Sequence, residues 1–388
     1  MSIHIGGRGP GHLARVQATE APLVTTSFTF TSALDAAFTA SGGANATSVD
    51  INGLVVADTA PRFNHTTAGV PLGLLVELAR TNICLWSDDL TNAAWTKSNA
   101  TTAKTATGPD GAANSATTLT ATAGNATCLQ SITSASNRRV TSCWIKRRTG
   151  TGAVQMTQDN GTTWAAVTVT AGWTQVSIAS AIATNPIVGL RVVTSGDAVD
   201  VALFQHETTT STTGFATSAI RTTTASVTRT ADTISCTGAS LSAWYTAARG
   251  TVVVTFRPGD VVGNQPVFWF TDTGVGDNLL ALSGSTAALV LNVYVAATTP
   301  IVAQNVGTIV TDTEHTAGVA FAVNDVAAVL DGGTVATFSD TSGGTPSNID
   351  SLTLGSEDGG STRFNGHIVS LTHYSKRKTN AELQTLTA

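Results

Sequence analysis

Hydrophobic and polar residues alternate along most of this chain, which is the pattern of β-strands with one buried face. The alternation is clear between residues 368 and 374, because side chains along a strand point to opposite faces in turn. It predicts a strand with Ile368 on one face and Val369, Leu371 and His373 on the other. Patterns with the helical period are scarce, so little helix is expected.

Turn and cap residues frame this closing strand. Asn365-Gly366 precedes it, a pair suited to positive φ angles. Thr379 follows, with Glu382 three residues later, and this capping box predicts the start of a short helix. A closing strand followed by a small terminal helix resembles the end of a concanavalin- or laminin-G-type jelly roll.

Two longer series of strands are predicted upstream. Between residues 81 and 221, short strands are separated by Gly, Asn, Asp and Ser turns at the spacing of a β-sandwich, with a strong hairpin turn at Asp159-Asn160-Gly161. A second series fills residues 222–388 and includes a buried-strand pattern from Gly250 to Phe256. The predicted fold class is therefore all-β, with two tandem jelly-roll β-sandwiches.

The first 80 residues differ from these series. Residues 28–80 are β-like, with a hairpin turning at Asn52-Gly53, but their sheet is too small to bury much alone. We interpret them as a small β anchoring region that packs on a neighbour or on copies of itself. Residues 1–27 are rich in glycine and have no clear period. They are predicted to be an N-terminal attachment arm that orders against a partner, or else a disordered tail.

Composition excludes several function classes. Of the 388 residues, only 12 % are charged and the net charge is −5, so the chain lacks the basic face that nucleic acid requires. One basic cluster, Arg138-Arg139 with Lys146-Arg147-Arg148, is interpreted as solvated strand ends. No stretch approaches the roughly 20 apolar residues of a membrane span, and no export signal is expected.

Cysteine and histidine spacing does not predict a metal site or another cofactor. The four cysteines are dispersed without a CxxC pair; Cys128 and Cys143 could meet across a hairpin, or all four could be free buried thiols. His367 and His373 could share a strand face, but no third ligand with zinc spacing is near. A calcium site in loops is a separate hypothesis, with ordinary turn aspartates as its alternative; its candidates are Asp272, Asp277 and Asp358.

Several sequence blocks, in their order and spacing, resemble a family of bacteriophage virion proteins described as head spike fibres, tail fibres or LamG/concanavalin-like phage proteins. The blocks are Pro61-Arg62-Phe63-Asn64-His65, Gly73-Leu74-Leu75-Val76-Glu77-Leu78-Ala79-Arg80-Thr81-Asn82, Asn92-Ala93-Ala94-Trp95-Thr96, Trp144-Ile145-Lys146-Arg147-Arg148, Gly172-Trp173-Thr174-Gln175-Val176-Ser177-Ile178, Val227-Thr228-Arg229-Thr230-Ala231-Asp232, Trp244-Tyr245 with Gly250-Thr251, Asn365-Gly366-His367-Ile368 and Asn380-Ala381-Glu382-Leu383.

This resemblance implies a structural appendage of a tailed-phage virion, on head or tail, that is assembled in the host cytoplasm. Residues 81–221 would be a carbohydrate-binding-module-like sandwich and residues 222–388 a LamG/concanavalin-like one. The expected partners are other virion proteins, through the N-terminal arm, and a host-surface glycan; fibre proteins in general also suggest a homo-oligomer. The alternatives are a capsid decoration protein that cements neighbouring subunits, and a polysaccharide depolymerase.

Motifs for catalysis are not evident, and the chain is predicted not to be an enzyme. It has no GxSxG, P-loop or dinucleotide fingerprint. His206-Glu207 and Glu314-His315 are adjacent pairs, but neighbours on a strand point to opposite faces. Asp88-Asp89 is interpreted as a turn. A depolymerase would need two carboxylates facing one groove, and sequence alone cannot bring these together.

Exposed aromatic side chains are the natural platforms for sugar rings. Trp144 and Trp173 lie within strand patterns and are expected to be buried, and Trp244 is expected to pack under the second sandwich. Trp269 alternates with core residues and could lie on either face. Trp164 follows the Asp159-Asn160-Gly161 turn, near a hairpin tip. We therefore predict a carbohydrate-binding edge formed by Trp164, Asp159 and Asn160.

Overall fold

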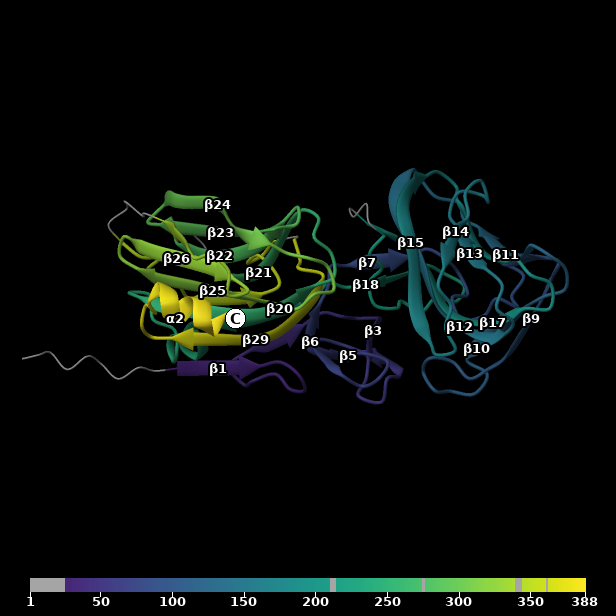
Figure 1. The fold of residues 1–388 in the computed structure, drawn as a ribbon, viewed down its shortest axis with the longest axis horizontal. Helices are drawn as coiled ribbons and strands as arrows, with labels where there is room; N and C mark the ends of the chain where they lie inside the picture. Colours follow the sequence, from purple (N-terminus) through teal and green to yellow (C-terminus); the bar gives the residue numbers. More distant parts are fainter. Residues whose placement is uncertain (1–24, 210–213, 274–275, 339–343, 361) are drawn as a thin grey trace, which may run out of the picture.

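The computed structural model describes residues 25–209, 214–273, 276–338, 344–360 and 362–388. Within these ranges the chain forms 29 β-strands and two short helices, so the all-β prediction is confirmed. The strands build two sandwiches that lie side by side, joined by β7 and β18 (Figure 1). Most of the predicted N-terminal arm, residues 1–24, lies outside the described residues.

The first sandwich, at the right of Figure 1, consists of two antiparallel sheets. Its larger sheet has the order β15-β12-β17-β10-β9, with β7 paired to β17 and β18. These strands are β15 (Thr174–Ala183), β12 (Asn137–Thr149), β17 (Ala198–Thr208), β10 (Ala116–Ala121), β9 (Ala100–Ala106), β7 (Arg80–Asn82) and β18 (Val227–Arg229). Its smaller sheet runs β14 (Ala165–Val167), β13 (Val154–Thr157), β16 (Ile187–Val192), β11 (Ala126–Ser131) and β8 (Thr96–Ser98).

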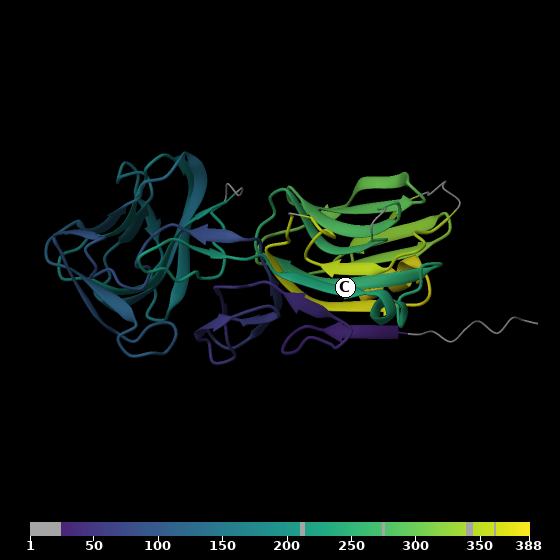
Figure 2. The same cartoon turned by 180° about the vertical axis from the view of Figure 1, so that it is seen from behind.

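The second sandwich also has two sheets, and Figure 2 shows them from behind. Sheet A runs β27 (Ala336–Phe338), β26 (Asp325–Leu330), β25 (His315–Ala322), β20 (Gly250–Pro258), β29 (Gly366–Tyr374), β6 (Pro71–Val76) and β5 (Arg62–His65), with β1 (Thr25–Thr29) on β29. Sheet B runs β2 (Thr39–Ser41), β19 (Thr233–Thr237), β28 (Ser351–Leu354), β21 (Asn264–Thr271), β22 (Leu279–Ser285), β23 (Ala288–Val295) and β24 (Thr298–Thr308).

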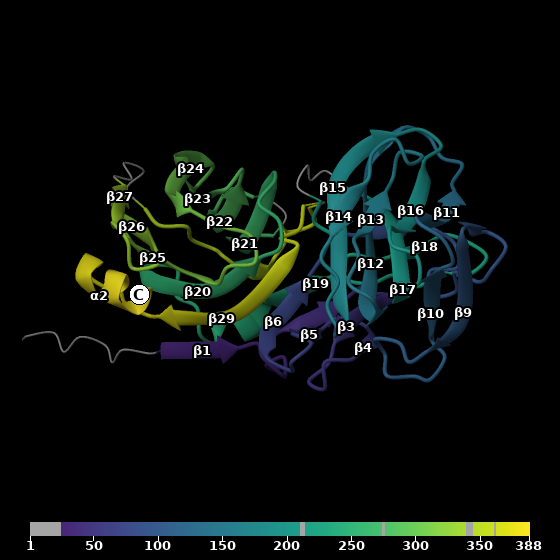
Figure 3. The ribbon, with the colours of Figure 1, turned by 45° about the vertical axis from the view of Figure 1, so that its right-hand side comes forward.

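The region predicted as a separate anchor, residues 28–80, is divided between the two sandwiches. Its strands β1 and β6 pair with β29, and β2 pairs with β19, so both sheets of the second sandwich include them (Figure 3). Its hairpin of β3 (Ala46–Val49) and β4 (Val55–Asp58) packs on the first sandwich, where Val49 and Val55 share a cluster with Trp144. Local patterning could not show this, because β1 pairs with a strand more than 340 residues later in the sequence.

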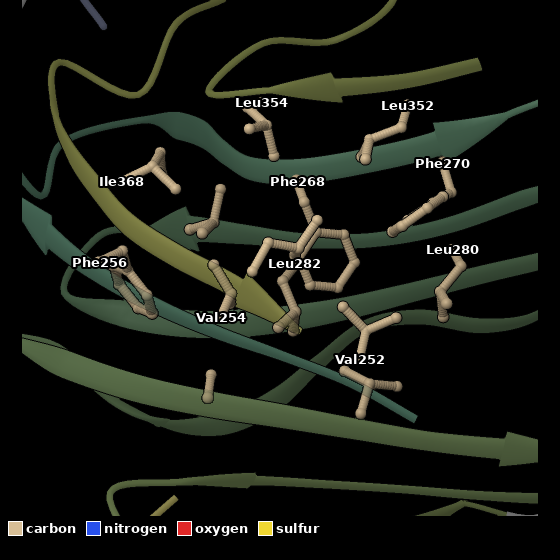
Figure 4. Close-up of a cluster of buried hydrophobic side chains, with 14 of the residues drawn as sticks. Val252, Val254, Phe256, Phe268, Phe270, Leu280, Leu282, Leu352, Leu354 and Ile368 are labelled. Carbon is tan, nitrogen blue, oxygen red and sulfur yellow. The ribbon is translucent and has the colours of Figure 1, made fainter. Parts of the chain in front are cut away.

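Hydrophobic burial between the sheets stabilises each sandwich. In the second sandwich, Val254 of β20 and Ile368 of β29 face Phe268 and Phe270 of β21 across the interior (Figure 4). In the first, Ile145 and Phe204 belong to the cluster that joins its two sheets. Trp144 and Trp244 are buried, as expected, whereas Trp173 is only half-buried.

The closing strand differs from the predicted alternation at one point. The register between β20 and β29 shifts between the pairs Thr255–Ser370 and Phe256–Ile368, which is a β-bulge at Val369. The extra residue reverses the alternation, so Ile368 and Leu371 both face the core, where opposite faces were predicted. The capping box at Thr379 is confirmed at the start of α2 (Asn380–Leu386); the other helix is α1 (Gly238–Ser242).

No helix among the described residues is long and apolar enough to cross a membrane.

Candidate functional site

A hollow on the outer face of sheet B brings two aromatic rings and two carboxylates together. Strict alternation produces it: Phe268 and Phe270 of β21 point into the core, so Trp269 between them points outward. On β23, Val293 and Val295 point inward and Tyr294 outward. Both outward rings are half-buried, and each therefore keeps an exposed part that a ligand can contact.

The hollow has a volume of about 360 Å³. Strand β22 lies between β21 and β23, so the two aromatic residues stand on strands roughly 10 Å apart. Leu279, which pairs with Tyr294, forms an apolar floor and is only 2 % exposed. The full lining is Trp269, Thr271, Asp272, Gly276, Leu279, Tyr294 and Asp358.

Asn278 holds the loop that forms the rim of the hollow. Asp272 accepts hydrogen bonds from the Asn278 backbone N–H (3.0 Å) and side-chain Nδ2 (2.9 Å). The Asn278 Oδ1 in turn accepts from the backbone N–H groups of Ala296 (3.2 Å) and Ser347 (3.1 Å). Two neighbouring loops are thereby tied to the first, and Asp272 is fixed before any ligand arrives. Asp358, on the loop after β28, is exposed.

This arrangement suits a saccharide. Half-exposed rings can stack on the apolar faces of sugars. Carboxylate oxygens accept hydrogen bonds from sugar hydroxyls, and protein hydroxyl groups can accept them or donate them. Of the three calcium candidates, Asp272 and Asp358 line the hollow and Asp277 does not. Among the described residues, no group of three or more His, Cys, Asp or Glu side chains is placed to hold a metal ion.

The structure places the predicted edge of Trp164, Asp159 and Asn160 on the β13–β14 hairpin of the first sandwich. The Trp164 ring is half-buried and lies under the Arg191 guanidinium, with 4.3 Å from Cζ to the ring centroid. Asn160 is exposed and has a φ of 65°, as expected for this turn. The three residues are therefore neighbours in space, and Arg191 covers one face of the ring.

Asp159 uses its carboxylate within the turn. Its oxygens accept from the Thr163 backbone N–H (2.9 Å), the Thr163 hydroxyl (2.6 Å) and the Thr157 hydroxyl (2.9 Å). Partial burial acts to raise the pKa of Asp159, but these hydrogen bonds outweigh it and lower the pKa below the ordinary value. Asp159 thus stabilises the hairpin and has little capacity left for a ligand.

The adjacent His and Glu pairs lie in packed surroundings. His206 accepts from or donates to the Thr141 hydroxyl through Nδ1 (2.9 Å), and burial, with Arg139 nearby, lowers its pKa to about 3. Glu207 accepts from the Thr217 backbone N–H (2.7 Å) and hydroxyl (2.6 Å), while burial raises its pKa. His315 pairs with Asp331 (2.6 Å). Neither pair faces the hollow.

A second polar cluster, which we name the junction, lies where the chain crosses between the sandwiches. It consists of Arg62, Glu77, Arg229 and Asp232, four side chains that are at most 2 % exposed. Arg62 binds Glu77 (2.7 Å) and Asp232, and Arg229 binds Glu77 (3.0 Å). Two guanidinium groups thus neutralise two carboxylates inside the molecule.

Backbone and hydroxyl groups complete the junction. Ser218, from the segment after β17, donates to Glu77 through its N–H (2.7 Å) and its hydroxyl (2.6 Å). Arg62 also donates to the Thr47 carbonyl of β3 (2.9 Å). Burial acts to raise the pKa of Glu77, but Arg229 and Arg62 outweigh it and lower the pKa to about 2. Burial raises the pKa of Asp232 in spite of Arg62 beside it. The junction is therefore a buried network of ion pairs and hydrogen bonds that braces the two sandwiches.

The other charged and thiol groups singled out in the sequence are also engaged or enclosed. In the basic cluster, Lys146 and Arg148 pair with Asp200 (3.7 and 2.7 Å) and Arg147 pairs with Asp197 (3.6 Å). All four cysteines are free, buried thiols. Burial raises the pKa of Cys128 to about 12, which keeps this thiol protonated and unreactive.

The sequence did not single out Tyr294 as a candidate ligand contact, and it did not predict which face of the sheet Trp269 occupies. A signal for Tyr294 was present: in Leu289-Val290-Leu291-Asn292-Val293-Tyr294-Val295 the aromatic ring shares its parity with Asn292, a polar residue. Trp269 had no such signal, because Phe268 and Phe270 on either side are as hydrophobic as the residue between them.

No family model and no curated protein matches the chain. Solved structures with a loose likeness include carbohydrate-binding modules of a Ruminococcus gnavus IT-sialidase. The CBM40 module is 13 % identical over 37 % of this chain and 84 % of its own, with a TM-score of 0.33. The same module bound to α2,3 sialyllactose is 14 % identical over 38 % of this chain and 87 % of its own (TM-score 0.35). Trypanosoma rangeli sialidase with the inhibitor DANA is 19 % identical over 40 % of this chain and 25 % of its own (TM-score 0.32).

Proposed function

We propose that this protein is a saccharide-binding adhesion protein and that the hollow on sheet B is its binding site. The observation that carries the proposal is the pair Trp269 and Tyr294, two half-exposed rings that line one hollow together with Asp358 and with Asp272, which Asn278 holds. Aromatic side chains with exposed faces on a rigid sheet are expensive to leave in water, and their alignment around an apolar floor fits a sugar ring.

A rigid support favours recognition without rearrangement. Both rings stand on central strands of sheet B, with neighbours on each side. On the rim, Asp272 is held by Asn278. A pre-formed site avoids the entropy of ordering a loop, which is one of the main terms that weaken binding. Affinity at a single shallow hollow is nevertheless modest, and several linked copies would raise it by avidity.

We further propose that the protein is displayed on the surface of a tailed-phage virion, as a head spike or a tail fibre, and attaches it to a host-surface glycan. This part rests on the resemblance of the sequence blocks described above. Residues 1–27 would contact other virion proteins, and self-association into a homo-oligomer would supply the linked copies. A capsid decoration protein without glycan binding would share the location and lack the ligand.

A glycan array probed with the full chain and with Trp269→Ala tests saccharide binding. We expect the wild type to bind a defined subset of glycans and the variant to lose about thirtyfold in affinity, the effect of removing a central aromatic anchor. An array without any bound glycan would reject the proposal. Release of reducing ends from a bound polysaccharide would instead identify a depolymerase.

Antibody labelling of purified particles tests the virion role. Label on the head surface or on the tail is the expected result, and the position distinguishes a head spike from a tail fibre. Failure to find the protein in purified particles, by labelling and by mass spectrometry, would show that the virion role is wrong and leave saccharide binding to be judged by the array.

A further inference from the structure

We propose that the saccharide bound at the hollow carries no negative charge: the ligand is a neutral sugar or one with a free amino group, and sialic acids, uronic acids and phosphorylated sugars are rejected. This inference rests on the proposed saccharide binding and adds the chemical class of the ligand. It follows from the charges in and around the hollow.

The hollow itself contains two carboxylates and no cation. Asp272 and Asp358 line it, and none of the described lining residues is Lys, Arg or His. An acidic sugar placed between Trp269 and Tyr294 would meet like charges, and none of the described lining residues offers a guanidinium or ammonium group to offset them.

The charged residues near the hollow are also negative. Between Arg257 and Arg363 the sequence holds eleven Asp and Glu residues, one His and neither Lys nor Arg. None of the seven strands of sheet B contains Lys or Arg. Asp350 stands beside the rim, where it accepts from the Thr273 backbone N–H (2.7 Å), and Glu357 adjoins Asp358 in sequence. The rim of the hollow is therefore negative, and the strands beneath it carry no Lys or Arg.

Three arginines of the second sandwich do not line the hollow and have partners of their own. Arg257, at the end of β20 in sheet A, pairs with Glu314 (3.9 Å), and Arg377 pairs with Asp325 of β26 in sheet A (2.7 Å). Arg363 donates to the Asp232 carbonyl (2.9 Å), next to the junction. Arg257 and Arg377 thus act in the opposite sheet. Arg363 follows Asp358 on the same loop, but its guanidinium donates to the Asp232 and Gly360 carbonyls and does not line the hollow.

The carboxylates that repel an acidic sugar would attract the protonated amine of an amino sugar. A protonated amine placed in the hollow could pair with Asp358, which is exposed, and could contact the faces of the two rings as cations commonly do. A neutral sugar would use the rings and the hydroxyl-to-carboxylate hydrogen bonds alone. We therefore expect affinity to follow the order amino, neutral, acidic.

Matched glycans test the order. The array should contain each neutral oligosaccharide next to the same oligosaccharide carrying a terminal sialic acid or a uronic acid, and oligomers of N-acetylglucosamine next to de-acetylated oligomers of the same length. We expect each acidic member to bind at least about tenfold more weakly than its neutral partner at low ionic strength, with a smaller ratio in high salt.

Two variants locate the effect. Asp358→Asn removes one negative charge at the hollow and should reduce the penalty on the acidic members. Asp325→Asn removes an equivalent exposed carboxylate in sheet A and should leave the ratio unchanged. Both positions are on the surface, so neither change threatens folding, and equal melting temperatures would confirm this.

The outcomes separate this inference from the proposed function. Binding of neutral or amino glycans with rejection of their acidic partners supports both. Equal or tighter binding of the acidic members overturns the charge inference and leaves saccharide binding intact. An unchanged ratio in Asp358→Asn shows that the hollow is not the origin of the selectivity, which also overturns the inference. An array that binds nothing removes the proposed function, and the inference falls with it.

Discussion

The junction and the hollow both contain carboxylates, but only those of the junction have cationic partners. In the junction, Glu77 and Asp232 are buried and each is bonded to a guanidinium group. In the hollow, Asp272 is held only by an amide and a backbone N–H, and Asp358 is exposed. Carboxylates with cationic partners hold the two sandwiches together, whereas the hollow has an exposed carboxylate, Asp358, that a ligand can reach.

This difference decides where function is to be sought. Arg62, Glu77, Arg229 and Asp232 all fall in the sequence blocks that carry the resemblance to phage proteins, and the structure gathers them at the chain crossings. Trp269 and Tyr294 fall outside those blocks. Three of the blocks thus supply the brace between the sandwiches, and the candidate binding surface lies in a part of the chain that the blocks do not cover.

The largest expected effect is at the junction. Replacing Arg62 with methionine leaves Glu77 and Asp232 buried with one guanidinium between them, and breaking a buried pair in this way destabilises a protein by about 3–5 kcal/mol. Denaturation by urea, followed by fluorescence, would measure the change in the free energy of unfolding.

Arg148→Met is the matched control, because Arg148 also binds a carboxylate, at 2.7 Å from Asp200, but is 41 % exposed. Its loss should change the free energy of unfolding by less than about 1 kcal/mol. Equal effects of the two substitutions would show that the junction is no stronger than a surface ion pair.

The next effect is the response of the junction to acid. The pKa of Glu77 is lowered from 4.5 to about 2, so the folded state binds its proton later than the unfolded state. Its contribution is fully present above pH 4.5 and is lost as the pH falls towards 2, by roughly 3 kcal/mol for this shift. Stability measured from pH 7 to 2 should decline in this window, and Glu77→Gln should remove that part of the decline.

His206 makes the stability fall with decreasing pH as well, but in a less acidic range than Glu77. Its pKa is lowered from 6.5 to about 3, so protons bind the unfolded state first and stability begins to fall below pH 6.5. His206→Gln should reduce the slope between pH 6.5 and 4.5 and leave the Glu77 window in place. The remaining slope comes from His367 and His373, because burial lowers the pKa of each to about 4. A curve that is flat in the wild type from pH 7 to 4 would contradict the buried, neutral state of this imidazole.

The extent to which sequence predicts these features depends on how local they are. Alternation and turn pairs are local, so the strands, the hairpin turn at Asn160 and the capping box at Thr379 could be predicted. The bulge at Val369 could not, because it depends on the register with β20. The junction could not either: Glu77 and Arg229 are 152 positions apart, and only the fold brings them together.

A smaller effect is expected from the second ring of the hollow. Tyr294→Ala should weaken glycan binding by about tenfold, less than Trp269→Ala, because the phenol offers less area than the indole. Tyr294→Phe keeps the ring and should retain most of the affinity. Titration calorimetry with the glycan selected on the array would give both ratios, and no change in Tyr294→Ala would restrict the site to Trp269.

The smallest effect is expected at the first sandwich. Trp164 was predicted from its turn to contact sugar, and its ring now lies under Arg191 while Asp159 bonds within the hairpin. If the hollow is the binding site, Trp164→Ala should change glycan affinity by less than about twofold while Trp269→Ala removes most of it. The reverse result, loss in Trp164→Ala and retention in Trp269→Ala, would move saccharide binding to the β13–β14 hairpin. Comparable losses in both variants would show two sites on one chain, because the residues stand on different sandwiches and cannot contact the same small sugar.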